Sequence, residues 1–219
     1  MRFRTVLACL LLGASTLTGL IADPINLSVE LGVPSIVQGD SVNVAIAISG
    51  LVDHAAPSLA AYELAITYDP LVLAHPVVTF GDPVLGDQLA LTFPSFKCVG
   101  PACGLSSMPL LMFELSFDSS ETLNTSQPGA FDLLTVHFDG IGVGSSPIKL
   151  SHILLVDSDG NDLRQSNQIN ISDSLITVNP VVQGQVPEPG SLLLFASTLV
   201  VLAALRRSRF KAKCLIEHR

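Results

Sequence analysis

The chain has 219 residues, 48% of them hydrophobic, and carries 11 Lys and Arg against 19 Asp and Glu, a formal net charge of −8. From Asp23 to Leu205 there are 18 acidic residues but only three basic ones, Lys97, Lys149 and Arg164, a formal charge of −15 for this body. Such a surface repels phosphate backbones and has no Lys/Arg cluster to neutralise them. The sequence therefore excludes a nucleic-acid-binding protein, while its length allows one good-sized domain plus targeting segments.

The first 22 residues have the organisation of an export signal. A positively charged start, Met1–Arg4, precedes the apolar run TVLACLLLGASTLTGLIA. This order predicts a Sec-type signal peptide over residues 1–22 with cleavage near Ala22, although Leu20 stands where a small residue is usual. Lipid modification of Cys9 is the alternative, and it is disfavoured because only about five apolar residues precede this cysteine, where an h-region has roughly 7–15.

Residues 23–180 have the pattern of a series of β-strands with no convincing amphipathic helix among them. Short segments alternate between apolar and polar residues and are separated by Gly, Pro, Asp and Ser, which is typical of half-buried strands. About nine strands are predicted, and their spacing favours an all-β sandwich over a βαβ fold. The predicted strands are INLSVEL, SVNVAIAIS, AYELAITY, VLAHPVVTF, QLALTF, LLMFELSF, FDLLTVHF, IKLSHILLV and SDSLITV.

The alternation also predicts the core. One face of SVNVAIAIS carries Val42, Val44, Ile46 and Ile48. One face of AYELAITY carries Tyr62, Leu64, Ile66 and Tyr68. Pro76 falls inside a predicted strand and indicates an edge strand or a break there. Since Trp is absent and aromatic residues are few, we expect a mostly aliphatic core, with six phenylalanines as its large pieces: Phe80, Phe93, Phe113, Phe117, Phe131 and Phe138.

Two cysteines of the body, Cys98 and Cys103, stand close together in FKCVGPACG. Four intervening residues around Gly100-Pro101 suit a small loop closed by a disulfide in an oxidising compartment. A metal knuckle is the alternative, but it needs a second Cys or His pair, and none follows. We therefore predict a Cys98–Cys103 disulfide, which contributes about 2 kcal/mol of stability in the chain-entropy model.

Three further groups of residues were weighed for chemistry. Gly39–Ser41 is similar to the nucleophile block of a lipase family, but a strand follows and no late Asp-x-x-His supplies a base, so a turn is favoured. The segment DSDGND at 157–162 fails the EF-hand spacing and favours a hairpin turn, with weak calcium binding as the alternative. Four histidines show no metal-ligand spacing. No catalytic residues, no metal site and no cofactor are predicted; these histidines are His54, His75, His137 and His152.

Three blocks of the body resemble cohesin-type domains, the sandwich modules of bacterial surface and cellulosome scaffolds. They are VQGDSVNVAIAISGL, AYELAITYDPLVL and FDLLTVHFDGIGVGSSPIKLSHILLVDSDGNDL. The resemblance covers roughly residues 25–178 and implies a cohesin-like jelly-roll β-sandwich of about nine strands over 23–180. It also implies binding through a sheet face or a loop rim, without requiring a dockerin partner.

The C-terminal part is organised as a linker, an apolar run and a basic tail. Residues 181–190 contain the triplet Pro187-Glu188-Pro189, and residues 191–205 are uninterruptedly apolar. As a helix this run is about 22 Å long, short of the ~30 Å hydrocarbon core, so it spans a bilayer only with local thinning or snorkelling. The tail 206–219 begins with a stop-transfer cluster, Arg206, Arg207 and Arg209, which predicts that this end stays in the cytoplasm and the body lies outside.

The order Val-Pro-Glu-Pro-Gly, short apolar helix and Arg cluster resembles the PEP-CTERM sorting signal of Gram-negative bacteria. The resemblance implies recognition by an exosortase, a membrane cysteine protease/transpeptidase, and delivery to the cell surface or an exopolysaccharide matrix. One departure is the long tail FKAKCLIEHR after the arginines.

These observations together predict a non-enzymatic surface or matrix binding protein. Its expected partners are an exosortase-type enzyme, the membrane before processing, and an exopolysaccharide or a surface protein, dockerin-bearing proteins included. The alternative is a glycan-active enzyme or carbohydrate-binding module built on a jelly roll.

Overall fold

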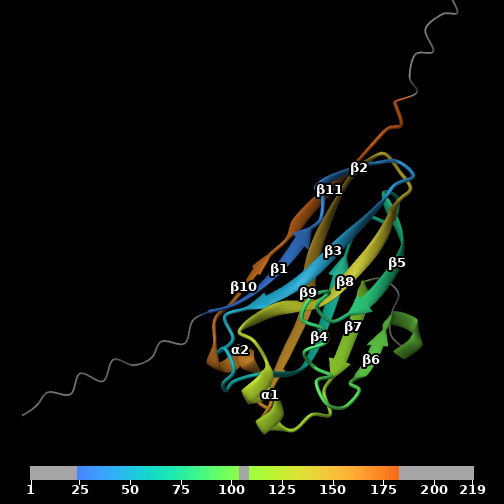
Figure 1. The fold of residues 1–219 in the computed structure, drawn as a ribbon. Coiled ribbons are helices and arrows are strands. Elements are labelled where there is room, and N and C mark those ends of the chain that lie inside the picture. The colour runs from blue at the N-terminus through green and yellow to red at the C-terminus, as the bar shows by residue number, and fades with distance from the viewer. Residues whose placement is uncertain (1–23, 104–108, 183–219) are drawn as a thin grey trace, which may run out of the picture. The chain divides into compact units, whose positions relative to one another are not determined.

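A computed structural model describes residues 24–103 and 109–182 (Figure 1). The chain divides into two compact units, Met1–Pro180 and Val181–Arg219. All described residues except Val181 and Val182 belong to the first unit, which is a sandwich of two β-sheets. An all-β sandwich is what the alternating sequence predicted.

The first sheet has five strands and the second has six. In spatial order the five-stranded sheet contains β10 (Ile169–Ser172), β1 (Ile25–Leu31), β3 (Ser41–Ser49), β8 (Ala130–Gly140) and β5 (Leu73–Phe80). The six-stranded sheet contains β2 (Ser35–Val37), β11 (Ser174–Asn179), β9 (Gly144–Asp157), β4 (Leu59–Thr67), β7 (Leu110–Leu115) and β6 (Phe96–Val99). The β1–β10 and β11–β2 pairs are parallel, and the other pairs are antiparallel. Figure 1 shows β3 in the middle of its sheet.

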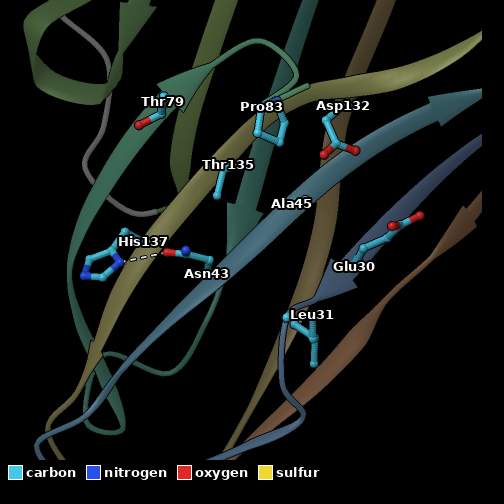
Figure 2. Close-up of a pocket in the computed structure, with 10 residues that line it drawn as sticks. Glu30, Leu31, Asn43, Ala45, Thr79, Pro83, Asp132, Thr135 and His137 are labelled. Carbon is cyan, nitrogen blue, oxygen red and sulfur yellow. Dashed lines mark hydrogen bonds between the residues drawn. The ribbon is translucent and has the colours of Figure 1, made fainter. Parts of the chain in front are cut away.

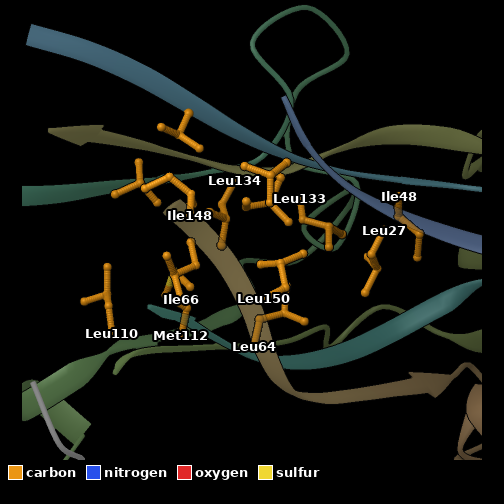
Figure 3. Packing of buried hydrophobic residues seen from close by; sticks show 14 of the residues in the cluster. Leu27, Ile48, Leu64, Ile66, Leu110, Met112, Leu133, Leu134, Ile148 and Leu150 are labelled. Carbon is orange, nitrogen blue, oxygen red and sulfur yellow. The ribbon is translucent and has the colours of Figure 1, made fainter. Parts of the chain in front are cut away.

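The core lies between the two sheets and is mainly aliphatic (Figure 3). The predicted inward face of β3 is confirmed, since all four of its apolar residues are buried: Val42, Val44, Ile46 and Ile48. Tyr62, Leu64 and Ile66 of β4 are fully buried, and Tyr68 packs against the core with its ring 4.8 Å from that of Phe138. Burial of this apolar area, at about 25 cal/mol per Å², is the main source of stability.

The prediction of the aromatic core was wrong in two places. Phe131 and Phe138 are buried, and Phe80 and Phe113 are partly buried, but Phe93 and Phe117 are 57% and 61% exposed. Phe117 follows the end of β7, where the alternation no longer sets which face a side chain takes. Tyr62 of β4, which the alternation placed on the inward face, is a large buried aromatic residue, and its hydroxyl donates to a buried partner.

The predicted strand QLALTF, residues 88–93, is a loop. Its backbone amides at Leu91, Thr92 and Phe93 donate to the carboxylate of Asp118, so a side chain takes the place of a neighbouring strand. The described residues form eleven strands rather than about nine. The additional ones, β2, β6 and β10, have only three or four residues each, too few to show an alternation.

Three short helical segments also lie in the described part of the chain: η1 (Gly100–Cys103), α1 (Ser120–Ser126) and α2 (Leu163–Ser166). The side chain of Ser119 accepts from the amide of Thr122 at the start of α1, and Asp162 caps α2 in the same way. Neither helix is long enough to carry an amphipathic repeat, which explains why the sequence gave no signal of them.

Two backbone features agree with the sequence. Pro76 lies in β5, which is an edge strand, and the pairing of β5 with β8 shifts register between Ala74 and Val77. Gly50 ends β3 with a φ of +86°, and a Cβ there would lie 2.3 Å from the carbonyl oxygen of Pro24. The Gly-Leu after SVNVAIAIS therefore marks a turn that only glycine fits.

Candidate functional site

A groove of about 600 Å³ runs over the outer, solvent-facing side of the five-stranded sheet (Figure 2). We call it the β3 groove, because β3 forms its floor between β1 and β8. Its lining residues come from four strands and two adjoining loops: Glu30, Leu31, Gly32, Asn43, Ala45, Thr79, Pro83, Asp132, Thr135 and His137. No Lys, Arg, Phe, Tyr or Trp lines it.

The floor is low because the outward positions of β3 hold small side chains. Ser41, Asn43, Ala45, Ala47 and Ser49 alternate with the buried residues of the same strand. In the pairing, Ala45 lies opposite Glu30 on one side and opposite Thr135 on the other. Alanine is disfavoured in strands, so its place on the central strand is not explained by propensity. The result is a trough with a methyl floor and polar walls.

A bulge in β8 determines which side chains form the wall of the groove on the β8 side. Ile46 pairs with Leu134 and Ala47 pairs with Asp132, so Leu133 is the extra residue. Leu133 and Leu134 are both buried, and Asp132 and Thr135 on either side therefore both reach the outer face. Bulges re-aim side chains in this way and are frequent beside functional sites. Figure 2 shows Asp132 and Thr135 on β8, with Glu30 on the far side of β3.

The groove is acidic. Burial raises the pKa of Asp132, and the negative charges of Asp82 and Glu30 raise it further. Burial alone would also raise the pKa of Asp82, but backbone N–H groups of Asp132, Leu85 and Val84 donate to its carboxylate and lower the pKa overall. The remaining polar groups are hydroxyls, an amide and an imidazole; His137 Nδ1 lies 2.8 Å from Asn43 Oδ1. The wall groups can thus both donate and accept hydrogen bonds and add negative charge.

Beside the groove, the Gly39–Ser41 segment has no catalytic arrangement. Ser41 Oγ donates to Asp139 Oδ1 at 2.9 Å, and His75 Nδ1 lies 3.1 Å from Asp139 Oδ2. The carboxylate therefore stands between serine and histidine, whereas a nucleophilic serine needs the histidine next to it. His137 also approaches Asp139, and His152 Nε2 lies 2.8 Å from Glu63 Oε1 on the other sheet. The turn interpretation of Gly39–Ser41 agrees with the backbone, since Gly39 has a φ of +97°.

The segment 157–162 is a tight turn that satisfies its own carboxylate. Asp157 Oδ1 accepts from the amides of Asp159 and Asn161, and Gly160 has a φ of +86°. A hairpin turn was predicted, and an antiparallel bridge between Val156 and Asp162 closes the turn before the chain enters α2. Over residues 24–103 and 109–182, no group of three His, Cys, Asp or Glu side chains is placed to hold a metal ion. Weak calcium binding stays a prediction.

A carboxylate is buried between the sheets near one end. Glu114 of β7 is 0% exposed and accepts from Tyr62 at 2.8 Å and from Ser95 at 2.6 Å. Lys97 contacts Asp87 and lies 3.7 Å from Glu114 Oε1. Burial raises the pKa of Glu114 to about 7, against the lowering by Ser95 and with a further rise from Asp87. The sequence signal was visible, because Glu114 shares the inward alternation of Leu110 and Met112.

The outer side of the six-stranded sheet has a different character. Phe96 of β6 is 50% exposed, pairs with Leu115 in register, and has its ring centroid 6.0 Å from that of Phe113. We call this cluster the apolar edge; it consists of Phe96, Phe113 and Leu115. An exposed aromatic side chain beside partly buried apolar ones is a candidate contact for a protein partner.

Most of the predicted sorting residues fall outside the described part of the chain. These are the signal peptide 1–22, the triplet Pro187–Pro189, the apolar run 191–205 and the arginines 206, 207 and 209. Among the residues that the structure describes, no helix is long and apolar enough to cross a membrane. Cys98 is disulfide-bonded, whereas the side chain of Cys103 is not described, so the Cys98–Cys103 pairing stays a prediction.

The comparisons with known proteins concern two separate parts of the chain, the C-terminal segment and the sandwich. Residues 185–208 match the PEP-CTERM protein-sorting motif. No curated protein matches the chain. The sequence resemblance to that sorting signal is thereby confirmed.

The sandwich has the fold of solved cohesin modules. One is the cohesin module of a family 33 glycoside hydrolase from Clostridium perfringens, with 13% identity over 72% of this chain and 98% of that one and a TM-score of 0.52. A type II cohesin from Acetivibrio cellulolyticus is 15% identical over 70% of this chain and 95% of that one, with a TM-score of 0.54. A type I cohesin from Clostridium thermocellum was solved in complex with a dockerin. It is 10% identical over 73% of this chain and 96% of that one, with a TM-score of 0.53. The resemblance in fold is confirmed, and none of these matches indicates an enzyme family.

Proposed function

We propose that this chain is the precursor of a non-catalytic binding module that is exported, held at the membrane by its C-terminal segment, and released to the cell surface or extracellular matrix by an exosortase-type enzyme. The observation that carries the proposal is the sorting motif at 185–208 directly behind a sandwich of cohesin fold. A module whose chain ends in a sorting signal has its task outside the cytoplasm.

The described surfaces support binding rather than catalysis. Asp139 stands between Ser41 and His75, which leaves the serine without a base. The β3 groove is open along a sheet face and is walled by single polar groups from several strands. Broad faces suit polymers and proteins, whereas small-molecule sites are enclosed and mostly apolar. We therefore favour an exopolysaccharide or a surface protein as the partner.

A protein partner is the second candidate, and the apolar edge favours it. Phe96 is 50% exposed on the outer side of the six-stranded sheet, and its ring centroid lies 6.0 Å from that of Phe113. Aromatic side chains are enriched at protein interfaces, where they act as anchors. Because the Clostridium thermocellum neighbour was solved with a dockerin, a dockerin-bearing surface protein is among the partners to test here.

The test of the proposal is a processing experiment in a bacterium that contains an exosortase. Replacing Pro187, Glu188 and Pro189 by alanine should leave an uncut, membrane-retained form, while the wild-type chain should be released without residues 191–205. Alanines at Val181, Val182 and Gln183 provide the control, because they change the same linker outside the motif. Mass spectrometry of the surface fraction measures the outcome. Intact C-terminal tails on released wild-type protein would contradict the proposal.

A further inference from the structure

We propose that the β3 groove binds a polysaccharide whose sugars carry free amino groups, with the ammonium groups between the carboxylates of Glu30 and Asp132. This inference rests on the proposed function and deepens it, because it names the class of matrix polymer. It draws on the shape, the charge and the hydrogen-bonding groups of the groove.

The shape favours an extended chain that lies along β3. Ala45 keeps the floor low, and its cross-strand partners Glu30 and Thr135 stand on either side. Asp132 lines the groove on the same strand as Thr135. Both edges of β3 are already paired, with β1 and with β8. A peptide therefore cannot add to β3 as a further strand, which is the usual way in which a sheet binds an extended peptide.

The charge of the groove selects a cationic ligand. Glu30 and Asp132 line it, Asp82 lies behind Asp132, and no Lys or Arg is among the lining residues. Two of the three basic residues in the body have other partners, since Lys97 contacts Asp87 and Arg164 contacts Asp162. The carboxylates therefore repel one another in the free protein. An ammonium group relieves that repulsion, whereas a uronic acid increases it.

The other polar groups of the groove favour a sugar over a basic protein segment. Asn43, Thr79, Thr135 and His137 offer donors and acceptors to hydroxyl groups. The groove has no Phe, Tyr or Trp side chain and, apart from Leu31, Ala45 and Pro83, no apolar side chain on which a protein could bury an anchor. A hydroxyl-rich chain with amino groups satisfies both the polar walls and the carboxylates.

The experiment measures binding of the purified full-length chain, kept in detergent, by calorimetry at mildly acidic pH. The probes are chitosan oligosaccharides, the same oligosaccharides fully N-acetylated, alginate, and polylysine. We expect chitosan to bind about tenfold more tightly than its acetylated form, and alginate not to bind. The double variant Glu30→Gln/Asp132→Asn should weaken chitosan binding about tenfold, since charged hydrogen bonds are lost. It should leave the acetylated form unaffected.

Filling the trough is the second variant. Ala45→Arg places a long cationic side chain on the floor and should abolish binding of both oligosaccharides. Leu175→Arg is the matched control, because it adds the same charge at an exposed position of the six-stranded sheet and should change nothing. Circular dichroism confirms folding of each variant. Should Ala45→Arg not fold, the double variant still decides.

Three outcomes overturn the inference: no binding of chitosan, chitosan binding unchanged in both groove variants, or polylysine binding as tightly as chitosan with the same loss in the variants. The last outcome would assign the groove to a basic protein. If glycan binding fails while the Pro187–Pro189 variant is still left uncut, the groove inference falls and the proposed function stands. If sorting fails while chitosan binds as expected, the proposed function falls and the binding inference for the groove stands.

Discussion

The two sheets bury faces of the same kind and expose faces of different kinds. Inward, β3 contributes the fully buried Val44 and Ile46. On β4, Leu64 and Ile66 are likewise fully buried (Figure 3). Outward, the five-stranded sheet carries the acidic β3 groove with its small residues, and the six-stranded sheet carries the apolar edge. The inward faces are constrained by packing, whereas the outward faces are free to differ. The inward positions therefore determine the fold, and the outward positions determine what each sheet can bind.

The largest expected effect is on an inward residue. Leu64→Ala should lower the free energy of unfolding by about 3 kcal/mol, because it removes buried methyl groups and leaves a cavity in the aliphatic core. Thr135→Ala, on the outward side of β8, should change it by less than about 0.5 kcal/mol. Chemical denaturation followed by circular dichroism measures both. Equal losses at the two positions would break the division between inward and outward faces.

The exception to that division is Glu114, a carboxylate on an inward face. Its pKa is raised to about 7 from an ordinary value of 4.5, so the folded state holds its proton more tightly than the unfolded state does. The stability that this proton contributes is present below about pH 4.5 and is lost as the pH rises toward 7. From pH 5 to 7 the wild type should lose roughly 2 kcal/mol.

The matched variant is Glu114→Gln, which does not titrate and keeps one acceptor oxygen in place of two, so that only one of Tyr62 and Ser95 can still donate to it. Its stability profile should be flatter between pH 5 and 7, and the Lys97–Asp87 contact remains in both proteins. Denaturation curves at several pH values supply the comparison. Parallel profiles would mean that Glu114 does not control this part of the pH dependence.

The predicted disulfide should affect the apolar edge more than the groove. Cys98 belongs to β6, and Cys103 ends the short helix η1 that follows it. We expect both thiols to be blocked in exported protein until reductant is added, as thiol labelling under denaturing conditions would show. Cys103→Ser should cost about 2 kcal/mol without unfolding the sandwich. Cys214→Ser, in the basic tail, is the control. Free thiols at Cys98 in freshly exported protein would contradict the pairing.

The sequence predicted the features that are repeated along a strand. Val44 and Ile46 could be placed inside because nine consecutive residues of β3 alternate. The short strands β2, β6 and β10 could not be found, since they exist through pairing with distant partners such as β11 and β1. Phe93 and Phe117 were misplaced because the tertiary contacts of Asp118, which hold the preceding loop, leave no local pattern.

The candidate site was only partly accessible to sequence reasoning. The sorting motif is a contiguous word and was found directly. The β3 groove depends on the register that brings Glu30 and Thr135 to either side of Ala45, which a single sequence does not contain. Two signals were available, however. The outward residues of SVNVAIAIS are all small, and two consecutive leucines, Leu133 and Leu134, interrupt the alternation where the bulge occurs.

The two outward faces can finally be separated by one substitution on each. Phe96→Ser removes an exposed aromatic from the apolar edge and should weaken capture of a surface-protein partner about tenfold, as truncation of an aromatic anchor does. It should leave chitosan binding unchanged, because Phe96 does not line the β3 groove. Ala45→Arg should abolish chitosan binding and leave capture of the protein partner unchanged.

Both positions face solvent, so neither change should lower the unfolding temperature by more than a few degrees. Surface plasmon resonance with the immobilised envelope-protein fraction on one channel and chitosan on the other measures both effects in the same protein. Loss of both activities in either variant would show that the two faces act as one site and that the contrast between them does not separate two partners.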